Sequence, residues 1–266
     1  MTGWLIYDER GAKRNEWFIS SFLQTAKRYG VKLLLKVVSG VADLEGWTLP
    51  DFVIVRTISP QINLFFEDRG VPTFNNYQTS RVANNKWLTY QLCLELGIPV
   101  MKTELLSTAL PSFDFPFVLK SLDGHGGSEV FLMRDRQALD ETLAMVDKSN
   151  YLAQEFCSSP GKDMRVYVLG DEIVCGVLRT SKHDFRSNFS LGGEVCVCEV
   201  TPKQREIIQK LRTAMQFDLV GVDFILHNGE WVLNEIEDVV GTRMLYRCTD
   251  MDIVDLYMRH ILNRLA

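Results

Sequence analysis

The chain has 266 residues, of which 46% are hydrophobic and 24% charged, and its formal net charge is −5. This composition is typical of a water-soluble globular protein of one or two domains, and the acidic balance argues against a nucleic-acid partner. No apolar run approaches the ~18 residues of a membrane helix, so no membrane partner is expected either.

The first residues lack the basic and apolar segments of a secretory signal. Six cysteines are scattered along the chain without a Cys-x-x-Cys pair. Reduced thiols in a cytoplasmic protein are therefore expected, and the sequence is compatible with a homo-oligomer.

The first part of the chain alternates predicted strands and helices. Strands are expected over residues 3–8, 31–38 and 51–56, and helices over 14–29 and 60–69. This alternation predicts a small parallel α/β domain, which we place at residues 1–80.

A helix over residues 80–96 opens the second part, placed at residues 81–153. Further elements follow in chain order: a strand at 117–120, a glycine-rich loop at 123–128, a strand at 130–133 and a helix at 136–148. Short strands around a turn and one helix predict an α+β unit.

The third part, placed at residues 154–266, follows a strand at 151–156. A hairpin at 163–180 is expected to turn at Gly170-Asp171. Thr201-Pro202-Lys203-Gln204 is a capping box with proline at N1, and it predicts a helix through Gln216. A hairpin at 219–237 and a helix at 252–264 complete the chain.

The two hairpins carry an unusual set of charges. The first, with the loop after it, holds Arg165, Arg179, Arg186 and Asn188, and the second holds three carboxylates. Cations beside clustered carboxylates suit a polyphosphate with its divalent metals. Salt bridges of the arginines with nearby aspartates are the simpler alternative.

The three carboxylates are Asp223, Glu235 and Glu237, and they are candidate Mg²⁺ ligands. Glu235 and Glu237 are two residues apart, so they share one face of a strand. A two-residue turn at Asn228-Gly229 would pair Asp223 with Asn234 and put the glutamates on the opposite face. A three-residue loop would pair Asp223 with Leu233 and bring all three together, and we expect this form.

Lys120 ends a predicted buried strand, and Gly124, Gly126 and Gly127 follow in the loop. Glycines let backbone N–H groups approach phosphate oxygens, and the lysine adds a positive charge. A plain hairpin turn fits the same residues. Arg56 ends the third predicted strand, where α/β domains bind ligands, and is a candidate for a substrate carboxylate.

These segments resemble the ATP-grasp superfamily, and within it the RimK-like ligases that join a carboxylate to an amine. The resemblance covers nearly the whole chain and is strongest over residues 84–240. Its most specific stretch is 154–193, which contains QEF, GKDMRVYVLGDE, LRTS and DFRSNFSLGG.

The resemblance implies an ATP-grasp fold of the mixed α/β (α+β) class, with an N-terminal α/β domain and two α+β subdomains that hold ATP between them. The implied ATP-binding residues are Lys86, Lys120, Gln154, Glu155, Phe156 and Asp163. Arg165, Arg179, Arg186 and Asn188 would serve catalysis. Asp223, Glu235 and Glu237 would hold two Mg²⁺ ions, with Mn²⁺ as an alternative.

Three departures from the family pattern stand out. Glu235-Ile236-Glu237 replaces the usual Glu-x-Asn, Asp238-Val239-Val240-Gly241 replaces the Ser-Pro-Gly that follows it, and Ser128-Glu129 replaces small residues in the glycine loop. The second departure borders the substrate pocket of relatives, so the substrates of relatives are a poor guide to the substrate of this chain.

The implied activity is an ATP-dependent ligase that forms an amide through an acyl phosphate and releases ADP and phosphate. A glutamate-like amino acid is the expected substrate. A modifier of a peptide, protein tail or carrier-bound substrate, and a nucleotide-binding protein or phosphotransferase without ligase activity, remain alternatives.

Overall fold

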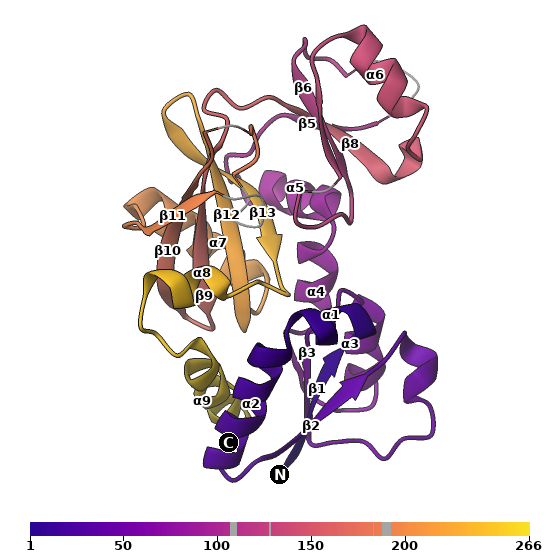
Figure 1. Ribbon diagram of the computed structural model, residues 1–266, viewed down its shortest axis with the longest axis vertical. Helices are drawn as coiled ribbons and strands as arrows, with labels where there is room; N and C mark the ends of the chain where they lie inside the picture. The colour runs from indigo at the N-terminus through magenta and orange to yellow at the C-terminus, as the bar shows by residue number, and fades with distance from the viewer. Residues whose placement is uncertain (107–110, 128, 183, 188–192) are drawn as a thin grey trace.

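The computed structural model describes residues 1–106, 111–127, 129–182, 184–187 and 193–266. Within these ranges the chain forms three β-sheets that lie in three lobes (Figure 1). The predicted mixed α/β architecture is present. The three-part division of the chain is consistent with the sheets, although its boundaries stay a prediction.

The N-terminal sheet is parallel, with strand order β2-β1-β3-β4. Its strands are β1 (Thr2–Tyr7), β2 (Lys32–Val37), β3 (Phe52–Val55) and β4 (Thr73–Phe74). Its helical segments are α1 (Glu9–Arg14), α2 (Glu16–Arg28), η1 (Val41–Leu44) and α3 (Pro60–Glu67). The predicted helix at 14–29 is present as α2, and the sequence did not predict the separate helix α1, which Asp8 caps by accepting from the Gly11 N–H.

Two helices, α4 (Tyr77–Ala83) and α5 (Lys86–Glu95), connect this sheet to the next. The sequence predicted one helix here. Asn85 breaks it, because its side chain accepts hydrogen bonds from the N–H groups of Trp87 and Leu88 and so starts a second helix. Lys86 thereby becomes the first residue of α5.

The central sheet has strand order β5-β8-β6-β7, and its neighbouring strands are antiparallel. The strands are β5 (Thr103–Leu105), β6 (Phe117–Ser121), β7 (Val130–Met133) and β8 (Tyr151–Glu155). The helix α6 (Arg136–Leu143) and the turn η2 (Lys148–Asn150) precede β8. Strand β8 spans the expected boundary at residue 153, and it pairs within the central sheet.

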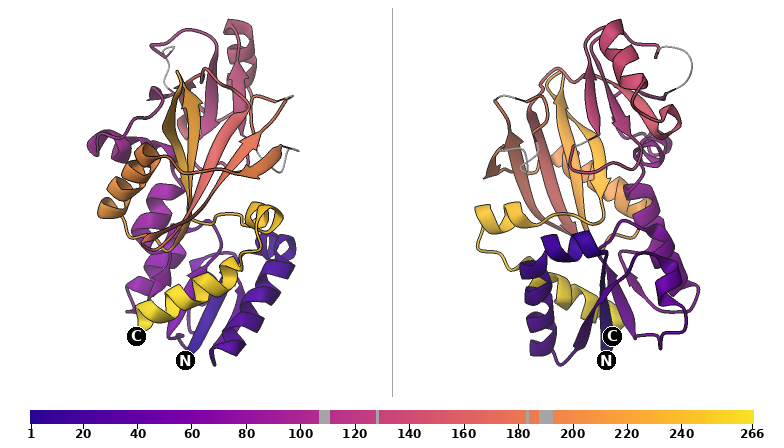
Figure 2. Two further views of the ribbon diagram at one scale, coloured as in Figure 1. Left: turned by 90° about the vertical axis from the view of Figure 1, so that its left-hand side faces the viewer. Right: turned by 45° about the vertical axis from the view of Figure 1, so that its right-hand side comes forward.

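The C-terminal sheet has strand order β11-β10-β9-β12-β13, again antiparallel throughout. Its strands are β9 (Lys162–Leu169), β10 (Glu172–Thr180), β11 (Glu194–Val197), β12 (Leu219–His227) and β13 (Glu230–Glu237). Helix α7 (Pro202–Ala214) begins with the predicted capping box of Thr201 and Gln204 and covers one face of this sheet (Figure 2). Helix α8 (Arg243–Cys248), which the sequence analysis missed, follows β13.

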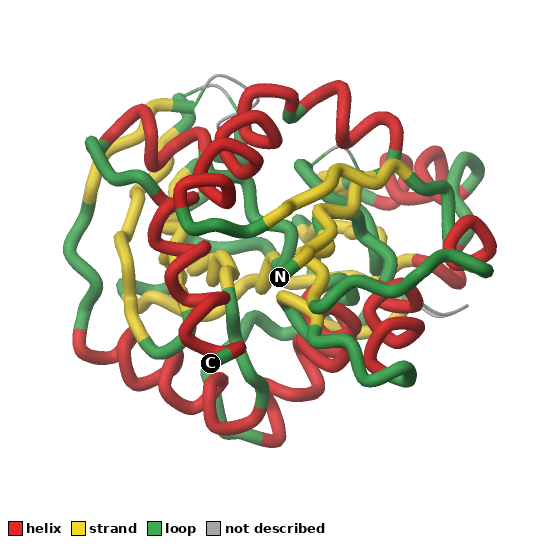
Figure 3. The backbone as a smooth tube through the Cα atoms, turned by 90° about the horizontal axis from the view of Figure 1, so that it is seen from below, coloured by secondary structure: helices red, strands yellow, loops and turns green. Residues whose placement is uncertain are grey.

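The last helix, α9 (Ile253–Leu265), lies beside α2 of the N-terminal lobe. Phe22 of α2 and Tyr257 of α9 belong to one hydrophobic core, which also includes Tyr167 of β9. The first and third parts of the chain therefore share a core, and both chain ends lie on the same side of the molecule (Figure 3).

Candidate active site

The two faces of the C-terminal sheet differ in chemistry because strand residues alternate in direction. Met164 and Val166 of β9 pack in the apolar cluster beneath α7. The residues that alternate with them, Asp163 and Arg165, and Asp223 on the neighbouring strand, point to the opposite face. The charged residues of the two hairpins thus meet on one face of the sheet.

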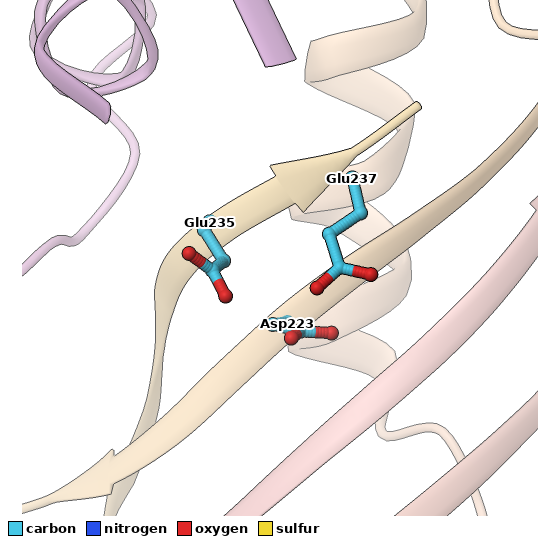
Figure 4. Close-up of side chains that lie close together, drawn as sticks. All are labelled: Asp223, Glu235 and Glu237. Atoms are coloured by element: carbon cyan, nitrogen blue, oxygen red, sulfur yellow. The ribbon is translucent and has the colours of Figure 1, made fainter. Parts of the chain in front are cut away.

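Asp223, Glu235 and Glu237 converge on that face (Figure 4). Each offers a carboxylate oxygen, and these oxygens all lie within 4.8 Å of one another. The predicted grouping is therefore present, and the donor set fits a hard divalent cation, which prefers carboxylate oxygens.

The predicted three-residue turn before this cluster is wrong. His227 pairs with Glu230, so the turn has two residues, and Asn228 and Gly229 both have positive φ. A β-bulge then inserts one extra residue into β13, because Phe224 pairs with Leu233 while Asp223 pairs with Glu235. The bulge at Asn234 puts Asp223 opposite Glu235, and this pairing brings the three carboxylates together.

Two buried arginines hold this cluster. Arg165 binds Asp223 through two hydrogen bonds of 2.7 Å each, and its Nη2 lies 2.6 Å from Glu237 Oε1. Arg179 donates to the second Asp223 oxygen at 2.7 Å and binds Asp163 through Nη2 at 2.6 Å. A salt bridge with a nearby aspartate, the simpler alternative for Arg179, thus exists, but as part of a buried network.

Burial and the neighbouring charges in this network shift the pKa values of its carboxylates. Burial alone would raise the pKa of Asp223, but the charges of Arg165 and Arg179 outweigh it and lower the pKa to about 2. Burial raises the pKa of Glu237, against the opposing charge of Arg165. Asp223 is therefore a permanent anion at neutral pH, and its oxygens are already oriented.

One cleft lies between the central and C-terminal sheets. It is lined by most predicted site residues: Lys86, Lys120, Gly124, Gly126, Gly127, Gln154, Glu155, Phe156, Asp163, Arg179, Arg186 and Glu235. Arg165, Asp223 and Glu237 do not line the cleft and lie behind it, in the network. Asn188 lies outside the described residues.

The two lysines hold different partners on the central side. Lys86 Nζ donates to Gly124 O and lies 3.9 Å from Glu235 Oε2. Lys120 Nζ donates to Asn234 Oδ1 at 2.8 Å. Burial lowers the pKa of Lys120 to about 8, although the charge of Glu235 opposes this.

The glycine loop and Arg186 meet across the cleft. Gly126 and Gly127 have φ of 71° and 77°, a conformation that side chains other than glycine rarely adopt. Arg186 Nη1 donates to Gly127 O at 2.7 Å, while Nη2 binds Asp184 Oδ2 at 2.7 Å. Arg186 thus connects the loop after β10 with the glycine loop.

The segment after β8 forms the end of the cleft. Gln154 is buried, and its side-chain amide donates to Thr103 Oγ1 of β5 at 3.1 Å. Glu155 and Phe156 line the cleft directly. The sequence analysis missed Asn234, the bulge residue that binds Lys120, because a bulge leaves no signal in the alternation of residue types.

A family model described as a RimK-like ATP-grasp domain matches residues 83–261. N-acetylaspartylglutamate synthase A from Homo sapiens is 28% identical over 77% of this chain and 58% of its own length. Ribosomal protein bS6--L-glutamate ligase from Shigella boydii is 29% identical over 82% of this chain and 79% of its own length. This chain therefore spans little more than half the length of some relatives: 50% of a probable alpha-L-glutamate ligase from Parasynechococcus marenigrum and 58% of the human synthase.

Among solved structures, D-alanine--D-alanine ligase from Bacillus anthracis, complexed with ATP, has a TM-score of 0.79 to this chain. The alignment covers 100% of this chain and 97% of that protein at 13% sequence identity. At this identity the similarity concerns the fold. No helix in the described part of the chain combines the length and the apolar character needed to cross a bilayer.

Proposed function

Because this chain belongs to the RimK-like ATP-grasp family, we propose that it is an ATP-dependent carboxylate–amine ligase. The family and the ATP-grasp fold are as the sequence predicted. In the proposed reaction, a substrate carboxylate takes the terminal phosphoryl group of ATP, which releases ADP. An amine then displaces phosphate from the acyl phosphate and forms the amide.

The observation that supports this proposal most strongly is the composition of the cleft. Lys86, Lys120 and the glycine loop lie on one side, and the network of Arg179 and the carboxylates lies on the other. Phosphoryl transfer depends on positioning and on stabilising negative charge, and it needs no covalent protein nucleophile. The cleft provides cations for the phosphates and anions for their metals.

Asp223, Glu235 and Glu237 are the residues that would hold Mg²⁺, as two ions, with Mn²⁺ as an alternative. Bound there, the metal would neutralise phosphate charge. Arg165 and Arg179 orient Asp223 and are close enough to the cluster to stabilise the phosphoryl group. Roles for Arg186 and Asn188 near the transferred group remain part of the proposal.

We propose an amino acid, with L-glutamate first, as one substrate. The names of two relatives, an N-acetylaspartylglutamate synthase and a protein bS6--L-glutamate ligase, support this choice. The second name also supports the alternative that a peptide or protein tail receives the glutamate.

The test is ADP release with Mg-ATP against a panel of amino acids, singly and in pairs, and against peptides with acidic ends. We expect release that depends on a pair including glutamate and that Glu235→Ala abolishes. Glu206→Ala, an exposed change on α7, is the matched control and should keep full turnover. AMP release, or pair-dependent turnover that survives Glu235→Ala, would contradict the proposal.

A further inference from the structure

Three arginines in the described part of the chain are buried, and one of them differs from the others. Arg165 and Arg179, 5% and 3% exposed, have carboxylate partners. Arg56 is 6% exposed, yet no carboxylate oxygen of the described residues lies within 4.0 Å of it. Burial raises the pKa of the Asp238 carboxyl and the charge of Arg56 opposes the rise, so this buried carboxylate is near the guanidinium, but it is not in contact with it. A buried charge without a carboxylate in contact is costly, so its retention points to an external anion.

The contacts of Arg56 leave donors unused. Its Nη2 donates to Val240 O at 2.7 Å, and its guanidinium lies 5.5 Å from the ring centre of Phe18. Its Nε has no hydrogen-bond partner among the residues that the structure describes. A neutral carbonyl and an aromatic ring compensate a buried guanidinium less well than a carboxylate would.

A second buried polar group lies beside it. Tyr7, the last residue of β1, is 1% exposed, and its hydroxyl makes no hydrogen bond of normal geometry with any described residue. Burial raises the pKa of this hydroxyl, and the charge of Arg56 and a weak hydrogen-bonding interaction with its guanidinium oppose the rise, as expected for neighbouring groups. Both residues are at the carboxyl ends of adjacent parallel strands, where α/β domains bind ligands.

This pair is connected to the carboxylate cluster. Val240, the partner of Arg56, comes three residues after Glu237. A Cβ atom placed on Gly221 would lie 2.7 Å from Val240 Cγ2 and 3.2 Å from Arg165 Cδ. Val240 therefore packs next to the residue that holds Asp223, and Arg56 lies directly behind it.

We propose that Arg56 and Tyr7 form a binding site for the carboxylate of an amino-acid substrate that is not itself activated. The inference rests on the proposed ligase function and names the recognition element of that site. The substrate carboxylate replaces the Val240 carbonyl as the partner of Arg56, and it accepts from Arg56 Nε and the Tyr7 hydroxyl. Segment 239–242, which has no regular secondary structure, moves aside to admit it.

The experiment is calorimetric titration of the full chain, saturated with Mg-ADP, with L-glutamate and with its α-amide. We expect the wild type to bind L-glutamate at least tenfold more tightly than the α-amide. Tyr7→Phe should weaken L-glutamate binding about tenfold, the typical effect of losing one hydrogen bond to a charged group. Arg56→Met should weaken it further, and both variants should lose the preference over the α-amide.

The stability of Tyr7→Phe separates recognition from a structural role. Because the Tyr7 hydroxyl is buried and makes no hydrogen bond of normal geometry with any described residue, its removal should leave Tm unchanged or raise it, while Mg-ADP affinity stays the same. Tyr29→Phe, an exposed change on the surface, is the matched control and should alter neither ligand affinity.

Three results would overturn the inference: no binding of L-glutamate to the wild type, unchanged L-glutamate affinity in Tyr7→Phe, or a lowered Tm in that variant. Failure of the inference is distinguishable from failure of the proposed function. Pair-dependent ADP release with other substrates would keep the ligase while excluding this carboxylate site.

Discussion

The two sides of the cleft hold their positive charges in different ways. On the C-terminal sheet, Arg165 and Arg179 are buried and bound to carboxylates of the chain itself. On the central side, Lys120 has only an amide oxygen of the described residues within hydrogen-bond distance, and Lys86 has a carbonyl and a carboxylate at 3.9 Å. The arginine side is internally neutralised, whereas the lysine side is short of negative charge.

This difference predicts separate roles for the two sides of the cleft, one in stability and one in ligand binding. A buried ion-pair network loses much stability when one partner is removed, because the remaining charges stay buried and unpaired. A desolvated lysine without a strong partner gains its partner when an anion binds. We therefore expect changes on the arginine side to affect folding first and changes on the lysine side to affect ligand binding first.

The largest effect is expected for Asp223→Asn. This change leaves Arg165 and Arg179 in place and removes the charge to which both donate. The free energy of unfolding should fall by about 3–5 kcal/mol, measured by urea denaturation. Asp171→Asn, whose carboxylate is 93% exposed, is the control and should stay within about 0.5 kcal/mol of wild type. A loss below about 1 kcal/mol for Asp223→Asn would contradict the assignment.

An intermediate effect, on binding alone, is expected for Lys120→Met. Mg-ATP affinity should fall about 10–100-fold, since a charge-assisted hydrogen bond contributes about 1.5–3 kcal/mol. The free energy of unfolding should stay constant or rise, because a desolvated charge is removed. Calorimetry and urea denaturation measure the two quantities. Lys210→Met on α7 is the matched control. A loss of stability without a loss of affinity in Lys120→Met would contradict the separate roles of the two sides.

The sequence predicted the grouping of the three carboxylates better than the backbone that produces it. Strand alternation was enough to place Glu235 and Glu237 on one face. It was not enough to place Asp223, because the two-residue turn at Asn228-Gly229 and the bulge at Asn234 compensate each other. A bulge depends on cross-strand hydrogen bonding, which residue types within one strand do not record.

Helix boundaries failed for a similar reason. Asn85 acts as an N-cap and divides the segment 80–96, which was predicted as one helix, and Asp8 caps a short helix that the sequence did not predict. The paired state of Arg165 also could not be predicted, since it depends on strands β9, β12 and β13 being neighbours. Its expected role in binding phosphate stays a prediction. Because Arg165 is bound to Asp223 and Glu237, it would act on a phosphate indirectly, through these carboxylates.

The smallest effect, and the most specific to the lysine side, is the pH dependence of nucleotide binding. Burial lowers the pKa of Lys120 to about 8 in the free protein. A bound phosphate favours the charged form, so the pKa of Lys120 rises on binding. Affinity is therefore complete below about pH 8 and falls as the pH rises above it, by about tenfold between pH 7 and 9.

Calorimetric titration of Mg-ATP at several pH values measures this profile, and Lys120→Arg is the diagnostic variant. Arginine keeps its charge throughout this range, so the decline should disappear. The arginine side cannot produce it, because neither guanidinium loses its proton below pH 10. An identical decline in Lys120→Arg would place the titrating group elsewhere and remove the evidence that the two sides of the cleft differ in available charge.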